Sequence, residues 1–551
     1  MGQPVDWWRH AAIYQVYPRS FADGDGDGVG DLAGVRARLP YLAALGVDAI
    51  WFTPWYPSDG ADGGYDVADY RSIDPVLGTL AEAEALIRDA GALGLRTIVD
   101  IVPNHIAASH PWFAEALAAG PGSSARDRFF FRPGRGVGGQ DPPNGWQSAF
   151  GGPAWRRVTE QDGSPGEWYL HLFAPEQVDL NWRNPQVRTE FEDVLRFWLR
   201  RGVSGIRIDS ATMIIKDPDL PEVPERPGPG NHPYVDQDEV HDVYRQWRTV
   251  VDEESGGTAA LVGEVWLADL DRLTAYLRPD ELHTAFNFDL MAQPWHADAL
   301  HASITRTLEA HRRVGAPATW VLSNHDVTRT VTRFGRADTA FDPAGRRPGV
   351  PTDLALGCRR AAAAALLVAA LPGSLYVYQG DELGLPEVED IDAEQRRDPI
   401  FAQTDGTDPG RDGCRVPLPW TASGTSHGFG PDDGAAPWLP QPAGWGTFAV
   451  DAQTGHPASM LTLYRTMLSL RRALPELAGQ DLRWVHGDGR SPLADPASGL
   501  LAFTRGDRFV CLVNLGPDPV PLPGAEVLLV SGPLTARSHL PSDTAAWVRL
   551  A

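Results

Sequence analysis

Short apolar runs alternate with longer amphipathic stretches along most of this 551-residue chain. Eight of the runs are rich in β-branched and aromatic residues, and their length and composition predict buried strands. The predicted strands are Ile13–Tyr17, Ala49–Thr53, Thr97–Val102, Gly205–Asp209, Leu261–Val265, Thr284–Phe288, Thr319–Ser323 and Ser374–Tyr378. Between and after them, apolar residues recur at the spacing of an amphipathic helix. The predicted helices include Thr79–Leu93, Gln186–Arg200, Asp236–Glu254 and Met460–Leu474.

Eight strands that alternate with helices predict an α/β fold of the (β/α)8 TIM-barrel type. A doubly wound sheet is the alternative, but such a sheet rarely sustains eight strand–helix units followed by further elements. We therefore expect residues 1–105 and 175–477 to form the two parts of one barrel.

Two segments interrupt the alternation. Residues 106–174 are rich in Gly, Pro and aromatic residues, and a structureless loop of this length is improbable in a compact domain, so we expect an inserted domain with short strands. In residues 478–551, apolar segments separated by Gly/Pro turns, such as Arg508–Asn514, predict a small all-β module. The Gly/Pro-rich stretch Asp405–Pro442 is predicted to be a long functional or mobile loop.

The composition restricts the class of partner. Apolar residues make up 43% of the chain and charged residues 22%, which is enough apolar material for a large core. The net charge of −24 argues against nucleic acid and against anionic membranes as partners, and it is compatible with a neutral substrate. Lys216 is the single lysine, and no general property of a fold explains why.

The cysteines and apolar runs bear on location. Cys358, Cys414 and Cys511 are too few for a disulfide framework. Met1–Arg19 has no continuous apolar core, so it does not resemble a secretory signal. The longest apolar run, Ala361–Leu371, is far shorter than a membrane span of about 20 residues. We therefore expect a soluble, cytoplasmic protein.

The predicted strand Gly205–Asp209 carries a candidate catalytic group. Side chains alternate along a strand, so Arg207 and Asp209 face the same side. A neighbouring cation lowers the pKa of a carboxyl, and we expect Arg207 to keep Asp209 ionised as a nucleophile. From this pentapeptide alone, a purely structural ion pair is an equally good interpretation.

Other chemically active residues follow the ends of other predicted strands. Glu264 lies among apolar neighbours beside Trp266, which would raise its pKa and favour a general acid. Asp326 follows Asn324 and His325, and Asp100–His105 ends the third strand. Because active sites of barrels lie at the carboxyl ends of the strands, four such clusters together predict a catalytic centre.

These motifs, in this order, resemble the conserved regions of glycoside hydrolase family 13, the α-amylase family. Within that family, the chain is similar to the α-glucosidase and oligo-1,6-glucosidase group. The residues that carry the resemblance are Trp8–Pro18, Asp62–Asp66, Pro143–Trp146, Phe150–Trp155, Val178–Asn181, Ala285–Phe288, Gln379–Gly384 and Arg411–Pro417, together with the four clusters. The resemblance implies a catalytic barrel, an inserted domain B after strand 3 and a C-terminal antiparallel β-sandwich.

The resemblance also implies roles for individual residues. Asp209 would be the nucleophile, Glu264 the general acid/base, and Asp326 the third carboxylate, which holds sugar hydroxyls. Arg207 would orient Asp209. The implied sugar-binding residues are His105, His325, the stacking platform Tyr65, and the pair Asp62 and Arg411, which would close the pocket and make the enzyme exo-acting.

The implied reaction is hydrolysis of terminal α-linked glucose by retaining double displacement, on short oligosaccharides, disaccharides or aryl glucosides. In this group, a small or polar residue at the position of Ser210 tends to accompany α-1,4 preference. An α-glucosyltransferase or a sucrose isomerase is the alternative on the same residues, although Val327–Thr330 replaces the Arg-rich loop typical of the isomerases. A non-catalytic relative is disfavoured because the three acids are retained. A monomer or a homodimer is expected.

A loop near the N-terminus predicts a metal site. Oxygen ligands at every second residue with glycines between them suit Ca²⁺, and Mg²⁺ is possible. Gly34 occupies the place of the closing Glu of an EF-hand, so the loop is not one. The resemblance implies one structural ion, with the ligands Asp23, Asp25, Asp27, the Val29 carbonyl and Asp31. A flexible acidic turn is the alternative. No organic cofactor is expected.

Overall fold

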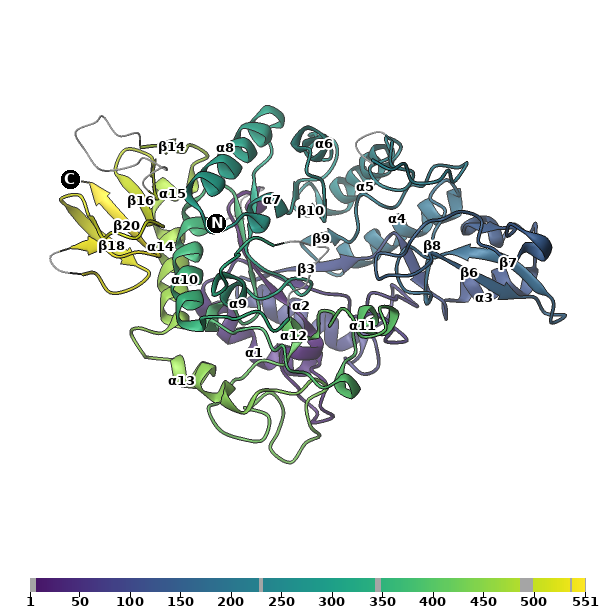
Figure 1. The fold of residues 1–551 in the computed structure, drawn as a ribbon, viewed down its shortest axis with the longest axis horizontal. Coiled ribbons are helices and arrows are strands. Elements are labelled where there is room, and N and C mark those ends of the chain that lie inside the picture. Colours follow the sequence, from purple (N-terminus) through teal and green to yellow (C-terminus); the bar gives the residue numbers. More distant parts are fainter. Residues whose placement is uncertain (1–5, 227–230, 342–347, 486–498, 536–537, 551) are drawn as a thin grey trace.

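The computed structural model describes residues 6–226, 231–341, 348–485, 499–535 and 538–550, and its centre is a barrel of eight parallel strands (Figure 1). All eight predicted strands are present. Their bounds are β1 Ala12–Val16, β2 Ala49–Phe52, β3 Arg96–Ile101, β9 Gly205–Ile208, β10 Ala260–Gly263, β11 Thr284–Ala285, β12 Thr319–Val321 and β13 Ser374–Tyr378.

The strands follow one another around a ring from β11 to β12, which distinguishes a barrel from a doubly wound sheet. The first strand, β1, pairs in parallel with both β2 and the last strand, β13. The two remaining ends, β11 and β12, meet through a hydrogen bond of 2.8 Å between the hydroxyls of Thr284 and Thr319. The amide of Asn287 also donates to the Thr319 carbonyl at 3.2 Å. The ring of strands is therefore closed.

Helices surround the barrel, and local sequence explains where they begin. Thr79 and Glu82 form a capping box at the start of α2. In α4, the predicted apolar face is buried, including Val187, Phe191 and Trp198. The longer helices are α1 Leu32–Leu45, α2 Leu80–Ala92, α4 Pro185–Leu199, α5 Val240–Ser255, α8 Ala297–Val314, α10 Leu354–Ala370 and α14 Met460–Ala473. The shorter ones are α6 Leu270–Ala275, α7 Phe288–Ala292, α9 Thr330–Phe334, α11 Pro399–Gln403, α12 Asp412–Arg415, α13 Val450–Gln453 and α15 Pro475–Ala478.

An inserted domain leaves the barrel after β3 and lies at one end of the molecule (Figure 1). Its elements are β4 His105–Ala107, α3 Pro111–Ala119, β5 Phe131–Arg132, β6 Trp155–Thr159, β7 Pro165–Leu170 and β8 Gln177–Asp179. Strands β5, β7 and β6 form an antiparallel sheet, and β4 pairs with β8. Trp146 and Trp155 belong to a small apolar core of this domain.

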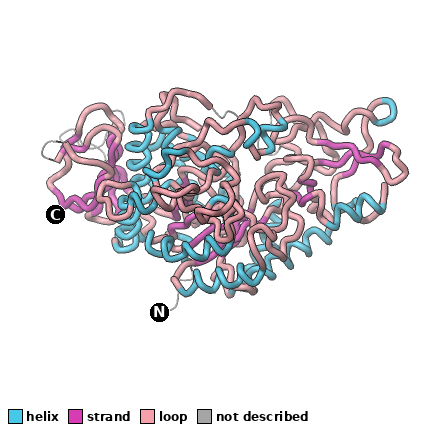
Figure 2. Tube along the Cα trace, turned by 90° about the horizontal axis from the view of Figure 1, so that it is seen from below, coloured by secondary structure: helices cyan, strands magenta, loops and turns pink. Residues whose placement is uncertain are grey.

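The C-terminal module lies at the opposite end from the inserted domain (Figure 2). It contains a five-stranded antiparallel sheet in the order β14-β15-β16-β20-β18 and a separate β17-β19 pair. The bounds are β14 Arg483–Trp484, β15 Leu500–Arg505, β16 Phe509–Asn514, β17 Val520–Pro521, β18 Ala525–Val530, β19 His539–Leu540 and β20 Thr544–Leu550. Trp547 of β20 donates to the Leu366 carbonyl of α10 at 3.1 Å, which fastens the module to the barrel.

Parts of the predicted domains, residues 1–5, 486–498 and 536–537 among them, lie outside the described residues. Within the described part of the chain, no helix has the length and apolarity needed to cross a bilayer. The run Ala361–Leu371 lies in and just after α10 and is buried. All three cysteines are free.

Candidate active site

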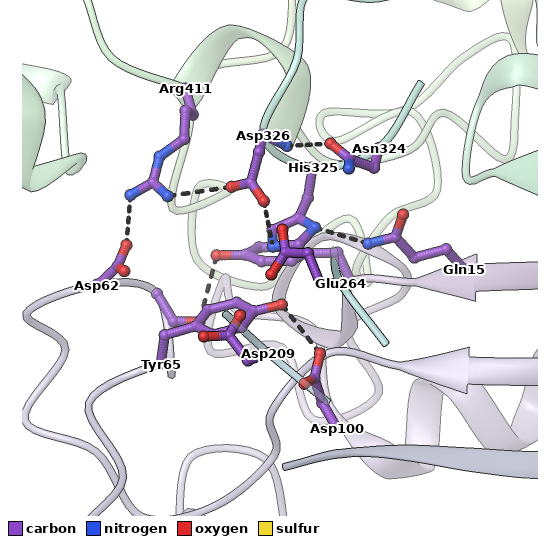
Figure 3. A network of polar contacts seen from close by, with 12 residues as sticks. Gln15, Asp62, Tyr65, Asp100, Asp209, Glu264, Asn324, His325, Asp326 and Arg411 are labelled. Carbon is purple, nitrogen blue, oxygen red and sulfur yellow. Dashed lines mark hydrogen bonds and ion pairs between the residues drawn. The ribbon is translucent and has the colours of Figure 1, made fainter. Parts of the chain in front are cut away.

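The register of three neighbouring strands brings the predicted catalytic carboxylates together. Ile101 of β3 is opposite Ile208 of β9, which is opposite Gly263 of β10. Asp209 and Glu264 each follow the last residue of their strand, so they emerge at the same level. Their amides continue the ladder: Asp209 donates to Ile101 and Glu264 to Ile208, both at 2.9 Å. Figure 3 shows both side chains in one group with Asp326.

A single guanidinium connects the two carboxylates. Arg207 lies 2.7 Å from Asp209 Oδ1 through Nη1 and 2.7 Å from Glu264 Oε2 through Nη2. Its Nη1 also lies 2.9 Å from Asp100 Oδ1 of β3. Arg207 is 1% exposed, and its buried charge is tolerated because three carboxylates, those of Asp209, Glu264 and Asp100, pair with it. The predicted link between Arg207 and Asp209 is therefore present, and it includes Glu264.

Burial controls the protonation of these two acids. It raises the pKa of Glu264 to about 7, against the opposing charge of Arg207. Arg207 lowers the pKa of Asp209 as predicted, but burial outweighs this effect. Burial raises the pKa of Asp209, and the charge of Arg207 and the hydroxyl of Ser210 only reduce that rise. A pKa near 7 allows Glu264 to carry a proton near neutral pH, as a general acid requires.

Asp326 has a different environment. It lies 3.0 Å from both Arg411 Nη1 and Arg415 Nη2, and 3.3 Å from His325 Nε2. Partial burial would raise its pKa, but the surrounding charges hold that pKa well below the usual range. Burial also lowers the pKa of His325 well below its usual value, so the imidazole is neutral and the two arginines supply the positive charge. Asp326 is therefore a permanent anion at neutral pH.

Arg411 and Asp62 form the predicted pair, although they are far apart in sequence (Figure 3). A second acid, Asp398, holds Arg411 more extensively. Its Oδ2 accepts from Arg411 Nε at 2.6 Å and from the Arg411 amide at 2.5 Å. Gln177 of the inserted domain donates to Asp62 at 3.3 Å. Burial raises the pKa of Asp62 to about 6, with Arg411 opposing the rise.

The remaining predicted sugar-binding residues surround this centre. Tyr65 stacks on His325 with ring centroids 5.2 Å apart, and its hydroxyl donates to Asp100 Oδ2 at 3.1 Å. Gln15 contacts His325 Nδ1 at 2.7 Å, so a donating amide leaves the proton on Nε2, facing Asp326. His105 is buried beside Gln177, and burial lowers its pKa to about 4. All nine predicted catalytic and sugar-binding residues thus lie in one region.

Sequence reasoning missed several partners in this region. Trp266 donates from Nε1 to Glu264 Oε1 at 3.0 Å. The sequence placed the two residues close together but did not predict this hydrogen bond. Asp398 resembles an ordinary helix cap before Pro399, and it also fills that role. Gln15 could have been identified from the sequence, because a polar amide within a strand of apolar and aromatic residues indicates a functional position. Arg415 could have been identified too, since it lies in the quoted Arg411–Pro417 motif.

The tryptophans of the inserted domain do not line the site. Trp146, Phe150 and Trp155 lie in the quoted motifs of this domain, which makes them candidates for lining the substrate entrance. Trp146 and Trp155 are 1% and 3% exposed in the core of the domain, where their indole nitrogens donate to Pro221 and Asn144. Phe150 does reach the site, since the Arg411 guanidinium lies 4.8 Å from its ring centroid.

The N-terminal acidic loop has a donor set that fits a hard cation. Carboxylate oxygens of Asp23, Asp25 and Asp27 all lie within 4.8 Å of one another. Backbone amides hold the loop around them, such as Val29 donating to Asp27 Oδ1 at 2.7 Å. Asp31 is outside this group, and it caps α1 by accepting from Gly34 at 2.6 Å. Three converging carboxylates would repel one another without a cation.

Hydrogen bonds also connect the acidic loop to the predicted Asp405–Pro442 loop. The amide of Asp23 donates to Phe429 at 2.8 Å, and the amide of Trp438 donates to Gly28 at 2.9 Å. That loop supplies Arg411 and Arg415 to the centre, so its predicted functional role agrees with its position.

Comparison with known proteins gives the family. Residues 15–479 match the family model described as "Alpha amylase, catalytic domain". The chain belongs to the α-amylase family. It is 37% identical to a protein named "Probable alpha-glucosidase" from Rhizobium meliloti (strain 1021), over 99% of this chain and 97% of that one. It is 33% identical to an "Oligo-1,6-glucosidase" from Parageobacillus thermoglucosidasius, over 85% and 84%.

A solved structure has the same architecture. The "alpha-glucosyl transfer enzyme, XgtA" superposes with a TM-score of 0.82 at 33% identity, covering 98% of this chain and 99% of that one. The family member described here thus shares nearly its whole length with relatives that are named as glucosidases and as a glucosyl-transfer enzyme.

Proposed function

We propose that this family member is an exo-acting, retaining α-glucosidase that releases terminal α-linked glucose from short oligosaccharides, disaccharides or aryl glucosides. The observation that carries the proposal is the pair of 2.7 Å contacts from Arg207 to Asp209 and to Glu264. Carboxylates that share one guanidinium lie side by side. Retaining glycosidases use such a close pair, whereas inverting enzymes separate the carboxylates to admit a water.

The two acids have different roles in each step, and their protonation states set those roles. Glu264, with its pKa raised to about 7 by burial, donates a proton to the glycosidic oxygen while a carboxylate oxygen of Asp209 attacks the anomeric carbon. The aglycone leaves with that proton. Glu264, now ionised, takes a proton from water, whose oxygen attacks the anomeric carbon. The bond to Asp209 breaks, and its electron pair returns to the carboxylate.

The surrounding groups bind the terminal glucose. Tyr65, held by His325 and Asp100, would present its ring face to the sugar. Neutral His105 and His325 would exchange hydrogen bonds with hydroxyls. The anion Asp326 would accept from ring hydroxyls, and its charge would favour the positive transition state. The pair Asp62 and Arg411 would hold the non-reducing end and exclude a longer chain there, which gives exo action.

Transfer of glucose to another acceptor is the second candidate, because XgtA is named for that activity and shares 33% of its sequence with this chain. Transfer uses the same first step and replaces water by an alcohol in the second. Hydrolysis is preferred here because relatives that align over most of this chain are named as glucosidases or as a hydrolase. Ser210 favours α-1,4 linkages within that activity, by the pattern of the group.

A substrate panel tests the proposal. The purified protein would be incubated separately with maltose, isomaltose, sucrose, trehalose and nitrophenyl α-glucoside, and the products separated by chromatography. We expect glucose from maltose, faster than from isomaltose, with the α-anomer formed first in NMR spectra. Longer or isomerised sugars as main products would favour the transferase or isomerase. No turnover of any α-glucoside would overturn the proposal.

We also propose that the acidic loop binds one structural Ca²⁺. Asp23, Asp25 and Asp27 would hold it, with the Val29 carbonyl and Asp31 as further ligands by resemblance. When bound, the ion would neutralise the carboxylates and stabilise the loop, with no part in the chemistry. The monomer or homodimer and the cytoplasmic location stay predictions.

A further inference from the structure

Ser210 contacts both catalytic carboxylates. Its amide nitrogen donates to Glu264 Oε2 at 2.9 Å, and its hydroxyl donates to Asp209 Oδ2 at 2.8 Å. Within the described part of the chain, only Arg207 also contacts the carboxylates of both acids. Ser210 therefore bridges the pair a second time: it shares Glu264 Oε2 with Arg207, and it binds Asp209 Oδ2, whereas Arg207 binds Oδ1.

The backbone holds Ser210 in this position. Its φ angle is 46°, in the left-handed region that residues other than glycine seldom adopt. Two hydrogen bonds surround the turn: the Met213 amide donates to the Ser210 carbonyl at 2.9 Å, and the Ala211 amide donates to the Glu264 carbonyl at 3.1 Å. Strained backbone of this kind persists where the surrounding structure requires it, and it is common at active sites.

The two oxygens of Asp209 are held differently. Oδ1 accepts from the guanidinium of Arg207, and Oδ2 accepts from the hydroxyl of Ser210. A donor to a carboxylate stabilises the anion, so it makes the group less basic and a better leaving group. In a double displacement, the carboxylate is the nucleophile in the first step and the leaving group in the second. A hydroxyl bound to it thus acts on the two steps in opposite directions.

We propose that Ser210 is a positioning residue whose hydroxyl orients the Asp209 carboxylate and promotes breakdown of the glycosyl-enzyme at the expense of its formation. This inference rests on the proposed retaining function. In the breakdown step, the bond between the anomeric carbon and Asp209 breaks, the electron pair returns to the carboxylate, and Ser210 stabilises the charge that forms. Water supplies the new oxygen, and Glu264 receives its proton.

The pH dependence of the reaction isolates this role. The hydroxyl of Ser210 opposes the burial that raises the pKa of Asp209. Its loss should therefore raise that pKa further and move the acid limb of kcat/KM to higher pH. A Ser210 variant leaves unchanged the other charged or titratable groups that interact electrostatically with Asp209. These are Arg207, Asp100, Glu264, Asp326, Tyr65, Tyr70 and Tyr244.

Two variants separate the hydroxyl from the backbone. Ser210→Ala and Ser210→Gly both remove the donor, but alanine keeps the backbone strain that serine bears at this positive φ, whereas glycine relieves it. Ser204→Ala is the matched control, because Ser204 precedes the amino end of the same strand, β9. Initial rates on nitrophenyl α-glucoside would be measured across pH, with the pre-steady-state burst and thermal midpoints of each protein.

We expect both Ser210 variants to show the same upward shift of the acid limb and a kcat lower by about five- to tenfold, which corresponds to the loss of one hydrogen bond of ordinary net strength. The burst should grow, because breakdown becomes slower than formation. Ser204→Ala should match the unmodified enzyme. The proposal would be overturned if the acid limb of kcat/KM stayed in place in both Ser210 variants. It would also be overturned if the limb shifted in Ser210→Ala but stayed in place in Ser210→Gly. If the unmodified protein turns over no α-glucoside, the proposed function itself fails instead.

Discussion

Lys216 of the barrel and Asp179 of the inserted domain form an ion pair that is fully buried, with Nζ 2.7 Å from Oδ1 and both side chains 0% exposed. Asn104, at the end of β3, also accepts from Lys216 at 2.6 Å. Asp179 in addition accepts from the Leu172 amide at 2.7 Å. The one lysine of the chain thus connects β8 to the segments that follow β3 and β9, next to the catalytic strands.

Removal of that lysine should loosen the inserted domain. Lys216→Met leaves Asp179 buried without its cation, a change that typically costs about 3–5 kcal/mol. We expect a clearly lower first thermal transition in calorimetry. The double variant Lys216→Met with Asp179→Asn removes the unpaired charge and should recover part of the loss. A single variant as stable as the parent would show that the pair does not hold the two parts together.

Asp209→Asn should abolish hydrolysis while the fold is kept. The amide is isosteric and still accepts from Arg207, but it cannot form a stable ester with the sugar. We expect kcat/KM for nitrophenyl α-glucoside to fall by at least about 10³-fold, or about 4 kcal/mol. Circular dichroism and the thermal midpoint should change little. Near-normal turnover would remove Asp209 from the role of nucleophile.

The alkaline limb of the pH profile should report Glu264. Burial raises its pKa to about 7, and the first step requires the protonated acid. The rate kcat/KM should therefore fall as the pH rises through about 7. Trp266→Phe removes a donor to the carboxylate, which destabilises the anion and should move this limb upward. A limb that stays in place would show that the indole contact does not act on Glu264.

Asp398 should affect binding through Arg411 although it has no assigned contact with substrate. Asp398→Asn weakens the charge-assisted bonds to the Arg411 guanidinium and amide. We expect KM for maltose to rise by about tenfold, with kcat changed by less than about threefold. Asp405→Asn, at an exposed acid on the same loop, is the matched control. Equal KM values in the two variants would contradict the supporting role of Asp398.

Calcium should stabilise the fold by mass action. Added Ca²⁺ at 100 times its Kd would contribute about 2.7 kcal/mol, and a chelator would remove it. The thermal midpoint should therefore rise with Ca²⁺ and fall with chelator. Asp25→Ala should abolish this response, whereas the exposed Asp390→Ala, away from the loop, should keep it. A midpoint that ignores both additions would argue for an acidic turn without an ion.

The strands and the principal acids were predictable because they depend on local patterns. A short apolar run such as Ser374–Tyr378 is stable in a parallel barrel as a buried strand, and this segment forms β13. Asp209 and Glu264 follow such runs, so the shared direction of parallel strands places them at one edge. Contacts of Asp398 with Arg411 and of Gln177 with Asp62 were not predictable in the same way. They depend on how loops from distant parts of the chain fold over that edge.

By itself, the sequence determined the barrel, the order of its strands and the acids at their carboxyl ends, since alternation and direction are properties of single strands. Only the tertiary structure decided how those acids are charged. Arg207 lies two residues from Asp209 in the sequence, which indicated a lowered pKa, yet closure of the barrel buries Asp209 and raises it. The physical reason is that desolvation depends on everything that surrounds a group, whereas sequence spacing reports only its neighbours along the chain.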